Sequence, residues 1–279
     1  MLMTPGEVTE LSAQRVDARA RLAVRRSGGL TRIERLYQEG AAKIRMPEVR
    51  SDPLEAILIN TAGGLTGGDR IAWEIEAGAG ASVSVTTQAC EKLYRSRSGE
   101  ARAAVRLSAA EGARIAWLPQ ETIAYDRSCF ARRLDVDLAE GAEALIVEAT
   151  LFGRLAMGET VSQALFRDRW RVRQGGRLVH AEAFSIGPDL AATLGRPAAA
   201  CGGTAVATLL LVSPDAEAFL PEVRRIIGEE GGASFWSVGG TGKLLARLVA
   251  GDGYGLRKRL TPLVGLLNGQ AGLPKVWTI

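Results

Sequence analysis

The sequence has little of what metal-holding and thiol-based sites are usually built from. Its 279 residues include a single histidine, His180, and three cysteines, Cys90, Cys129 and Cys201. None of these four residues share the short local spacing of a zinc site, and a cysteine nucleophile would have to recruit the histidine from a distant strand. An odd number of scattered cysteines also argues against a disulfide framework. We therefore expect no tightly bound metal or other cofactor.

Long apolar segments and a strong charge are missing as well. The longest apolar run, residues 204–212, is far too short to span a bilayer, and the first twenty residues lack the apolar core of a secretory signal. The net charge of +4 is a small difference between 35 basic and 31 acidic residues. That excess is too weak to indicate nucleic acid as a partner. We expect a cytoplasmic chain that binds neither membrane nor nucleic acid.

Two glycine-rich runs resemble phosphate-binding loops but lack their essential residues. TAGGLTGGD, residues 61–69, has neither the dinucleotide-binding spacing nor a following lysine. We interpret it as a tight structural loop after which Asp69 starts the next strand. GGTGK, residues 239–243, has Ser237 where a P-loop needs glycine and Leu244 where it needs a hydroxyl. We therefore predict no nucleotide site. The glycines of the first run are Gly63, Gly64, Gly67 and Gly68.

The centre of the chain contains a loose repeat of about 30 residues. Small turns with a central glycine occupy residues 79–81, 111–113 and 140–142, which are 32 and 29 residues apart. Before each turn apolar and polar residues alternate, as in a strand with one buried face, and after each turn a second strand ends in polar residues. Such units stack because each needs a neighbour to bury its face. We predict an all-β, stacked-strand, solenoid-like single domain over residues 1–279, with the consecutive hairpins of a β-sandwich as the alternative.

Alternating strands are also predicted on both sides of the repeat. Residues 17–26 and 31–38 form a strand pair, and residues 165–173 carry four arginines on one strand face. That face is either solvated or holds an acidic protein partner, because no aromatic platform for stacking bases accompanies it. The four arginines are Arg167, Arg169, Arg171 and Arg173.

The C-terminal third is expected to contain two or so helices. One runs from the cap at residues 213–215 to about residue 228, and the other covers residues 255–267. Residues 243–250 fit either a helix or a strand. Residues 1–12 have no periodic pattern and are expected to form a flexible arm.

Four carboxylates lie within 39 residues at predicted strand ends or in the loops that follow them: Glu121, Asp126, Glu148 and Glu159, with Arg154 among them. One interpretation is a glycan-active β-solenoid enzyme that uses Glu121 and Glu148 as an acid/base pair. A second is the transient handling of a hard or borderline cation by oxygen ligands. A third is purely structural, with buried carboxylates paired with arginines.

Five runs, in this order, resemble the urease accessory protein D family, also called UreD or UreH: TAGGLTGGD, TTQACEKLYRS, WLPQETI, LFGRLAMGE and FRDRWRVR. The terminal LPKVW is similar to the closing segment of that family. The likeness is dense over residues 57–184 and looser towards both ends. Cys90 stands where the family commonly has a small residue, so its thiol is not expected to be essential. The positions that match the family motifs are Gln88, Glu121, Asp126, Arg154, Met157 and Glu159.

The resemblance implies a non-enzymatic chaperone of nickel-urease maturation with a stacked-strand fold and a few helices. Such proteins bind accessory protein F, which recruits the GTPase accessory protein G, and dock on the urease apoprotein. Nickel is thought to pass through a water-filled passage inside the accessory proteins. We therefore expect Glu121, Asp126, Glu148 and Glu159 to line or gate a route for nickel in transit, since a tight histidine or cysteine site would retain the metal.

Overall fold

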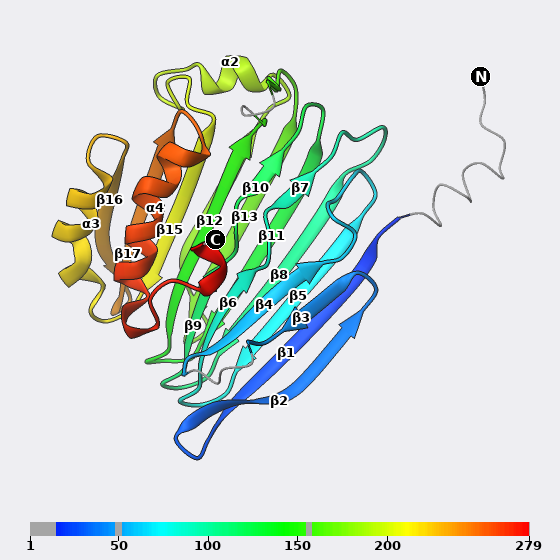
Figure 1. Ribbon diagram of the computed structural model, residues 1–279. Coiled ribbons are helices and arrows are strands. Elements are labelled where there is room, and N and C mark those ends of the chain that lie inside the picture. The colour runs from blue at the N-terminus through cyan, green and yellow to red at the C-terminus, as the bar shows by residue number, and fades with distance from the viewer. Residues whose placement is uncertain (1–14, 48–51, 155–157, 279) are drawn as a thin grey trace.

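Two β-sheets face each other in the computed structural model, which describes residues 15–47, 52–154 and 158–278 (Figure 1). The predicted arm at residues 1–12 and the motif residue Met157 lie outside the described residues. Sheet A contains, in spatial order, β14 (Arg177–Ile186), β13 (Leu165–Gln174), β11 (Cys129–Leu138), β8 (Ala101–Ala109), β5 (Arg70–Ala77), β1 (Asp17–Ser27) and β2 (Leu30–Glu39).

Sheet B lies against sheet A and is completed by two short strands. Its main path is β16 (Gly231–Val238), β17 (Thr241–Ala250), β15 (Ala205–Val212), β12 (Glu143–Phe152), β9 (Arg114–Leu118), β6 (Ser82–Thr87), β4 (Leu54–Asn60) and β3 (Ala42–Arg45). The short strands β7 (Glu91–Leu93) and β10 (Thr122–Ala124) pair with each other, and β10 also pairs with β12.

The repeat predicted from the sequence forms the coils of a β-solenoid. β5, β8 and β11 are parallel neighbours in sheet A, and β6, β9 and β12 are parallel neighbours in sheet B, so each repeat gives one strand to each sheet. The turn glycines Gly80, Gly112 and Gly141 all have positive φ, a backbone conformation that side-chain-bearing residues rarely adopt. Hairpins of a sandwich would make these neighbours antiparallel. The solenoid prediction is confirmed and the sandwich alternative is wrong.

The core lies between the sheets, and a second apolar layer lies between sheet B and the helices. β12 shows why both layers exist, because its apolar residues point both ways. Ala144 and Ile146 belong to the cluster between the sheets, whereas Leu145 and Val147 belong to the cluster with the helices. A strand buried on both faces has few polar positions, as observed here.

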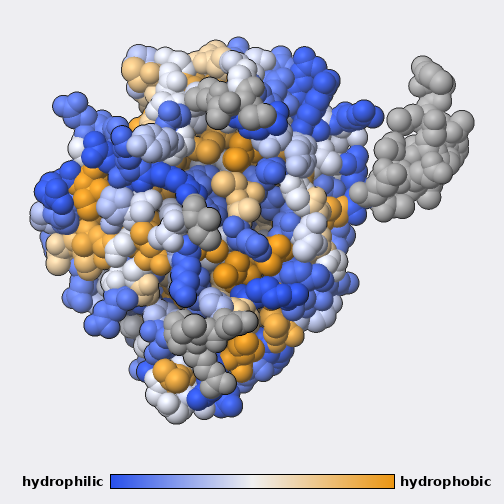
Figure 2. Space-filling model, in the orientation of Figure 1, coloured by the Kyte–Doolittle hydropathy of each residue, from blue (hydrophilic) through white to orange (hydrophobic). Residues whose placement is uncertain are grey.

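Helices α3 (Leu220–Ile227) and α4 (Gly253–Leu267) cover the outer face of sheet B near β15, β16 and β17 (Figure 1). Asp252 caps α4 by accepting a hydrogen bond from the Gly255 backbone nitrogen at 2.7 Å. On this side of the molecule, hydrophobic patches are small and separated by hydrophilic residues (Figure 2). The remaining helical elements are α2 (Leu190–Leu194), η2 (Ala216–Phe219), η3 (Gly269–Ala271) and η4 (Lys275–Trp277).

The helices of the C-terminal third agree with the prediction, and the ambiguous segment is resolved. The segment after residue 215 starts as the 3₁₀ turn η2 and continues as α3, and α4 begins two residues before the predicted start. Residues 243–250 are part of strand β17, where alternate residues pack against the helices. Helix α2 was not predicted. None of the helices in the described ranges is both long and apolar enough to cross a membrane.

Candidate functional site

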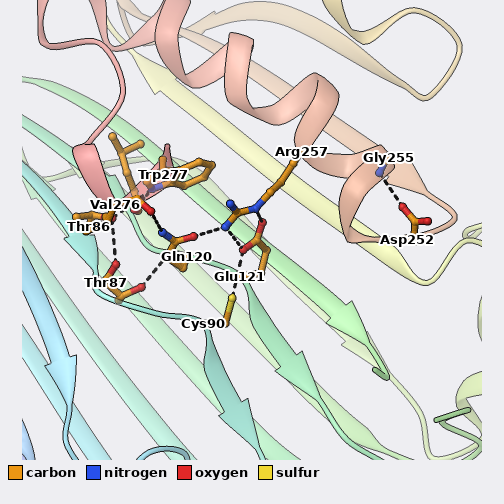
Figure 3. Close-up of polar contacts among 11 residues, drawn as sticks. Thr86, Thr87, Cys90, Gln120, Glu121, Asp252, Gly255, Arg257, Val276 and Trp277 are labelled. Carbon is orange, nitrogen blue, oxygen red and sulfur yellow. Dashed lines mark hydrogen bonds and ion pairs between the residues drawn. The ribbon is translucent and has the colours of Figure 1, made fainter. Parts of the chain in front are cut away.

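A polar network joins the end of β9 to α4 and to the C-terminal turn η4. Glu121 follows β9 in the chain, and its side chain is directed at Arg257, which projects from α4 towards sheet B (Figure 3). The Arg257 Nε donates to Glu121 Oε1 at 2.7 Å, and its Nη2 donates to Glu121 Oε2 at 2.8 Å. This two-point contact matches the planar guanidinium to the planar carboxylate. We call Gln120, Glu121, Arg257 and Trp277 the C-terminal clasp.

The other members of the clasp fix the last residues of the chain. Gln120 accepts a hydrogen bond from Arg257 through its Oε1, and its Nε2 donates to the Val276 carbonyl at 2.7 Å. The indole Nε1 of Trp277 donates to the Leu118 carbonyl at 3.1 Å and to Thr86 Oγ1 at 3.2 Å. The polar strand ends of the first two repeats meet here, where helix α4 and the C-terminal turn cover them, whereas Glu148 of the third repeat lies elsewhere.

Arginine controls the electrostatics of the clasp. Burial would raise the pKa of the Glu121 carboxyl, but the hydrogen bonds and charge of Arg257 outweigh burial and hold that pKa below its ordinary value. Cys90 donates to Glu121 Oε2 at 3.4 Å. Burial, together with the Glu121 charge, raises the pKa of the Cys90 thiol to about 11. The thiol is therefore protonated at neutral pH and is a poor nucleophile.

A second cluster, the interior triad, lies between the two sheets. It consists of Arg132 on β11, Glu148 on β12 and Asp168 on β13, all at most 8% exposed. Arg132 donates through Nη1 to Glu148 and through Nη2 to Asp168 Oδ2, the latter at 2.6 Å. Two indoles complete the cluster: Trp117 Nε1 donates to Glu148 Oε1 at 2.8 Å and Trp170 Nε1 donates to Asp168 Oδ2 at 3.0 Å.

The triad has two carboxyl groups for one guanidinium. Burial raises the pKa of Glu148 to about 7, and the neighbouring Asp168 charge acts in the same direction against the opposing effect of Arg132. Asp168 Oδ1 and Arg132 Nε are buried without a hydrogen-bond partner among the described residues. A buried polar atom without a protein partner normally has a water or an ion beside it. Asp168 Oδ1 is therefore free to accept a hydrogen bond from a water or to bind a cation.

The remaining predicted carboxylates, Asp126 and Glu159, are neighbours in the loops that follow β10 and β12. Asp126 Oδ1 accepts hydrogen bonds from the backbone nitrogens of Ser162 and Gln163, at 3.0 and 3.1 Å. Burial alone would raise the pKa of Asp126, but these backbone donors lower it. Glu159 accepts from Arg154 Nε at 2.7 Å and from the Asp126 nitrogen at 3.4 Å. Both acids are thus partly engaged in shaping the loops.

The four predicted metal-path carboxylates occupy three places. Asp126 and Glu159 come together, Glu148 lies between the sheets, and Glu121 lies on the opposite, helix-covered side of sheet B. The acid/base pair of the glycan-cleaving alternative is therefore wrong, because Glu121 and Glu148 cannot flank one bond from opposite faces of a sheet. Across the described ranges, no group of three or more histidine, cysteine or acidic side chains is arranged to hold a metal ion.

The glycine-rich motif is a structural loop, as predicted. A Cβ on Gly64 would lie 2.4 Å from the Tyr94 ring, and one on Gly67 would lie 2.0 Å from Ser96 Oγ. These glycines let the chain after β7 pack directly against the loop. Asp69 is buried and accepts from the backbone nitrogens of Val16 and Thr66, at 2.9 and 2.7 Å.

The motif glutamine and the outer glycines play smaller parts. Gln88 is exposed, and its backbone nitrogen donates to the Leu58 carbonyl at 2.9 Å. Gly63 and Gly68 have φ of 76° and 93°, which explains glycine at both positions.

Sequence reasoning missed Asp168 and Arg257, and it named Arg132 only as one of four arginines, with Arg127, Arg133 and Arg154, that could pair with buried carboxylates. Arg132 and Asp168 occupy inward-facing positions of strands whose other inward residues are apolar, such as Phe130 and Phe166. For Arg132 and Asp168, the available signal was therefore a charged residue at a position where the strand alternation predicts an apolar one. Arg257 had no such signal, since nothing local connects it to a glutamate 136 residues earlier.

Comparisons with known proteins match nearly the whole length of the chain. The family model described as UreD urease accessory protein matches residues 16–278. A Mesorhizobium japonicum protein named urease accessory protein UreD is 65% identical over 276 residues, covering 98% of this chain and 99% of that protein. The Brucella abortus protein named urease accessory protein UreD 1 is 60% identical over the full length of both chains. A Brucella suis protein named urease accessory protein UreD is 62% identical over 95% of each chain.

Proposed function

The chain belongs to the UreD family of urease accessory proteins, and from this we propose that it acts in urease maturation as a non-enzymatic chaperone. The observation that carries the proposal is identity of 60–65% over nearly the full length of relatives named as urease accessory proteins. In this role the chain docks on the urease apoprotein together with accessory proteins F and G in the cytoplasm. GTP hydrolysis falls to a partner, in keeping with the failed P-loop match at residues 239–243.

Nickel is the cargo in this proposal, and the interior triad is the best-supported point on its route. Its two carboxyl groups and one guanidinium leave a spare negative charge when both acids are ionised, and Asp168 Oδ1 has no partner in the described part of the chain. Carboxylate oxygens bind divalent cations more weakly than histidine or thiolate sites do, which suits transfer rather than storage. Asp126 and Glu159 form a second, separate pair of oxygen donors on the route.

Glu121 contributes differently to the proposed function. Both of its carboxylate oxygens are hydrogen-bonded to Arg257, so the group is already neutralised. We assign it to holding α4 and the C-terminal turn on sheet B rather than to contact with the metal. The nickel route therefore depends on Glu148 more than on Glu121.

Complex formation tests the role in maturation. The purified chain is mixed with accessory protein F, and then with accessory protein G and urease apoprotein, and each mixture is separated by size exclusion. We expect co-elution with F and then with the larger assembly. A chain that elutes alone in every mixture, while a relative carried through the same steps forms the complex, would refute the proposal.

Nickel loading tests the route separately. Glu148→Gln removes the charge and keeps the shape, and we expect less nickel per urease active site while the complex still elutes intact. Glu76→Gln is the matched control, because Glu76 is exposed on the outer face of sheet A. Equal nickel content in urease matured with the two variants would remove the triad from the route without touching the docking role.

A further inference from the structure

A groove of about 800 Å³ crosses the outer face of sheet A, which lies behind sheet B in the view of Figure 1. It extends over β1, β5, β8, β11 and β13. We call it the arginine groove, because arginine is its main charged residue: Arg19, Arg70, Arg102, Arg133, Arg167 and Arg169. The urease-maturation proposal assigns no role to this face.

The hollow follows from the register of the strands. Ala72 and Ala104 are direct partners on β5 and β8, and Ala131 is the partner of Arg102 on the next strand. Alanine side chains reach one carbon above the sheet, whereas the arginines around them extend much further. A shallow apolar floor with cationic walls is the result.

The arginines of the groove are only partly neutralised. Glu100, at one end, pairs with Arg102 and Arg167. Arg70 and Arg169 make no ion pair with any described residue. Each guanidinium has five donors and stays charged at any physiological pH, so these two remain available to a ligand.

The rest of the same face is different in charge. In the next row of residues aligned across the strands, Glu74 forms ion pairs with Arg21 and Arg106, with nitrogen–oxygen distances of 2.9 and 3.9 Å. Further along, Arg173 pairs with Asp137 at 3.9 Å. Acidic and basic residues nearly balance there, although Arg171 also makes no ion pair with a described residue, so the excess of positive charge is concentrated in the groove.

We propose that the arginine groove binds an extended, acidic peptide segment of a partner protein. The groove crosses five strands, a distance of about 19 Å at about 4.8 Å per strand step. About six extended residues cover that distance. Carboxylate side chains suit the guanidinium walls, which bind them through two parallel hydrogen bonds. The alanine floor leaves room for the peptide backbone. This inference is independent of the role in urease maturation.

A peptide fits the groove better than a nucleic acid does. None of the lining residues is aromatic, so bases would have no platform to stack on. Carboxylates also border the arginine groove. Asp17 and Glu100 lie on one side of it, and Glu74 and Asp135 lie on the other side, in the next row of aligned residues. These carboxylates limit the positive zone, so a long ligand with a negative charge on every unit of its backbone would be repelled where it passes them.

The test is a binding measurement on the full chain by fluorescence anisotropy. The probes are a labelled hexaglutamate peptide, a hexaglutamine peptide of equal length and a twelve-nucleotide oligothymidylate. We expect hexaglutamate to bind in a salt-sensitive manner, and to bind more tightly than both other probes. Failure of hexaglutamate to bind, or tighter binding of the oligothymidylate, would overturn the proposal.

Two matched double variants locate the binding. R70Q/R169Q removes the two unpaired groove arginines, and R106Q/R171Q removes the same charge from the balanced part of the same face. We expect the first pair to weaken hexaglutamate binding by about tenfold or more and the second by less than about twofold. Equal weakening by both pairs would mean attraction by overall charge and no site. All four side chains are exposed, so unchanged melting temperatures are expected, and R169Q alone carries the same test should the first pair unfold.

Discussion

Each face of sheet B carries a cluster of arginine and carboxylate side chains, and the two clusters differ in the ratio of guanidinium to carboxyl groups. In the C-terminal clasp one guanidinium, that of Arg257, meets one carboxylate, that of Glu121, at the edge of solvent. In the interior triad Arg132 meets two carboxyl groups, Glu148 and Asp168, away from solvent. The one-to-one pair has a lowered carboxyl pKa, and the two-to-one cluster has a raised one. Burial and the second carboxyl group, rather than the residue types, separate a structural contact from one that can accept a proton or a cation.

The largest effect is expected from removing the shared guanidinium. Arg132→Met leaves two buried carboxyl groups without their cation, and we expect the free energy of unfolding at pH 7 to fall by about 3–5 kcal/mol. Urea denaturation measures it. The loss should shrink as the pH is lowered, because protonation of Glu148 removes one of the uncompensated charges. A loss below about 1 kcal/mol would show that the triad is not a cooperating unit.

A smaller effect is expected on the helix-covered face. Arg257→Met leaves the buried Glu121 carboxylate unpaired, and we expect a loss of about 2 kcal/mol, since Glu121 can relax towards water. Hydrogen exchange of residues 273–278 should accelerate. The matched control is Arg259→Met on the same helix, whose pair with Glu230 is exposed and should contribute less than about 0.5 kcal/mol. Equal losses in both variants would remove the distinction between a clasp and a surface pair.

The pH dependence of stability should have opposite signs for the two glutamates. The pKa of Glu148 is raised in the folded chain from near 4.5 to about 7, so the folded state holds a proton that the unfolded state has released between these values. Stability from this group is complete below about pH 4.5 and is lost as the pH rises to about 7. The pKa of Glu121 is lowered, so its contribution is present at neutral pH and is lost as the pH falls below the ordinary glutamate range.

Two glutamine variants separate the contributions of Glu148 and Glu121 to the pH dependence of stability. Glu148→Gln should flatten the fall of the unfolding free energy between about pH 4.5 and pH 7. Glu121→Gln should instead flatten the acid limb, below the ordinary pKa of glutamate near 4.5. Denaturant titrations at several pH values measure both. An unchanged neutral slope in Glu148→Gln would assign that proton to another group.

The smallest effect is expected at the thiol beside the clasp. Cys90→Ala removes one weak sulfur donor, and we expect the free energy of unfolding to change by less than about 1 kcal/mol. In the unsubstituted chain, the exposed Cys201 should react with iodoacetamide at pH 7.5 well before Cys90, whose thiol has a pKa raised to about 11. Mass spectrometry of the alkylated peptides gives the order. Faster labelling of Cys90 would mean that the clasp is open in solution.

Much of the fold could be predicted because its signals are local. Side-chain alternation on β5, β8 and β11 and the glycine in each following turn indicate a repeated strand unit, and the recurrence of that unit about every 30 residues favours stacked coils, although only the parallel pairing excludes a sandwich. The clasp and the triad could not be predicted in the same way. Arg257 lies 136 residues from Glu121, and Arg132 meets Asp168 only because β11 and β13 are parallel neighbours. Which side chains lie opposite each other on neighbouring strands depends on how the strands are aligned. The local pattern of a single sequence does not specify that alignment.

The position of Trp277 has a consequence for the order of events during synthesis. Its indole bonds to the carbonyl of Leu118, 159 residues earlier, and to Thr86 on the neighbouring strand. A polypeptide grows from its amino end, so the middle of sheet B is translated long before the residue that seals its outer surface. Until α4 and the C-terminal turn have been made, the outer face of the strand that carries Leu118 lacks its cover and Glu121 lacks its partner Arg257. The helix-covered face of sheet B is therefore buried later during synthesis than the core between the sheets, whose buried residues all precede residue 213.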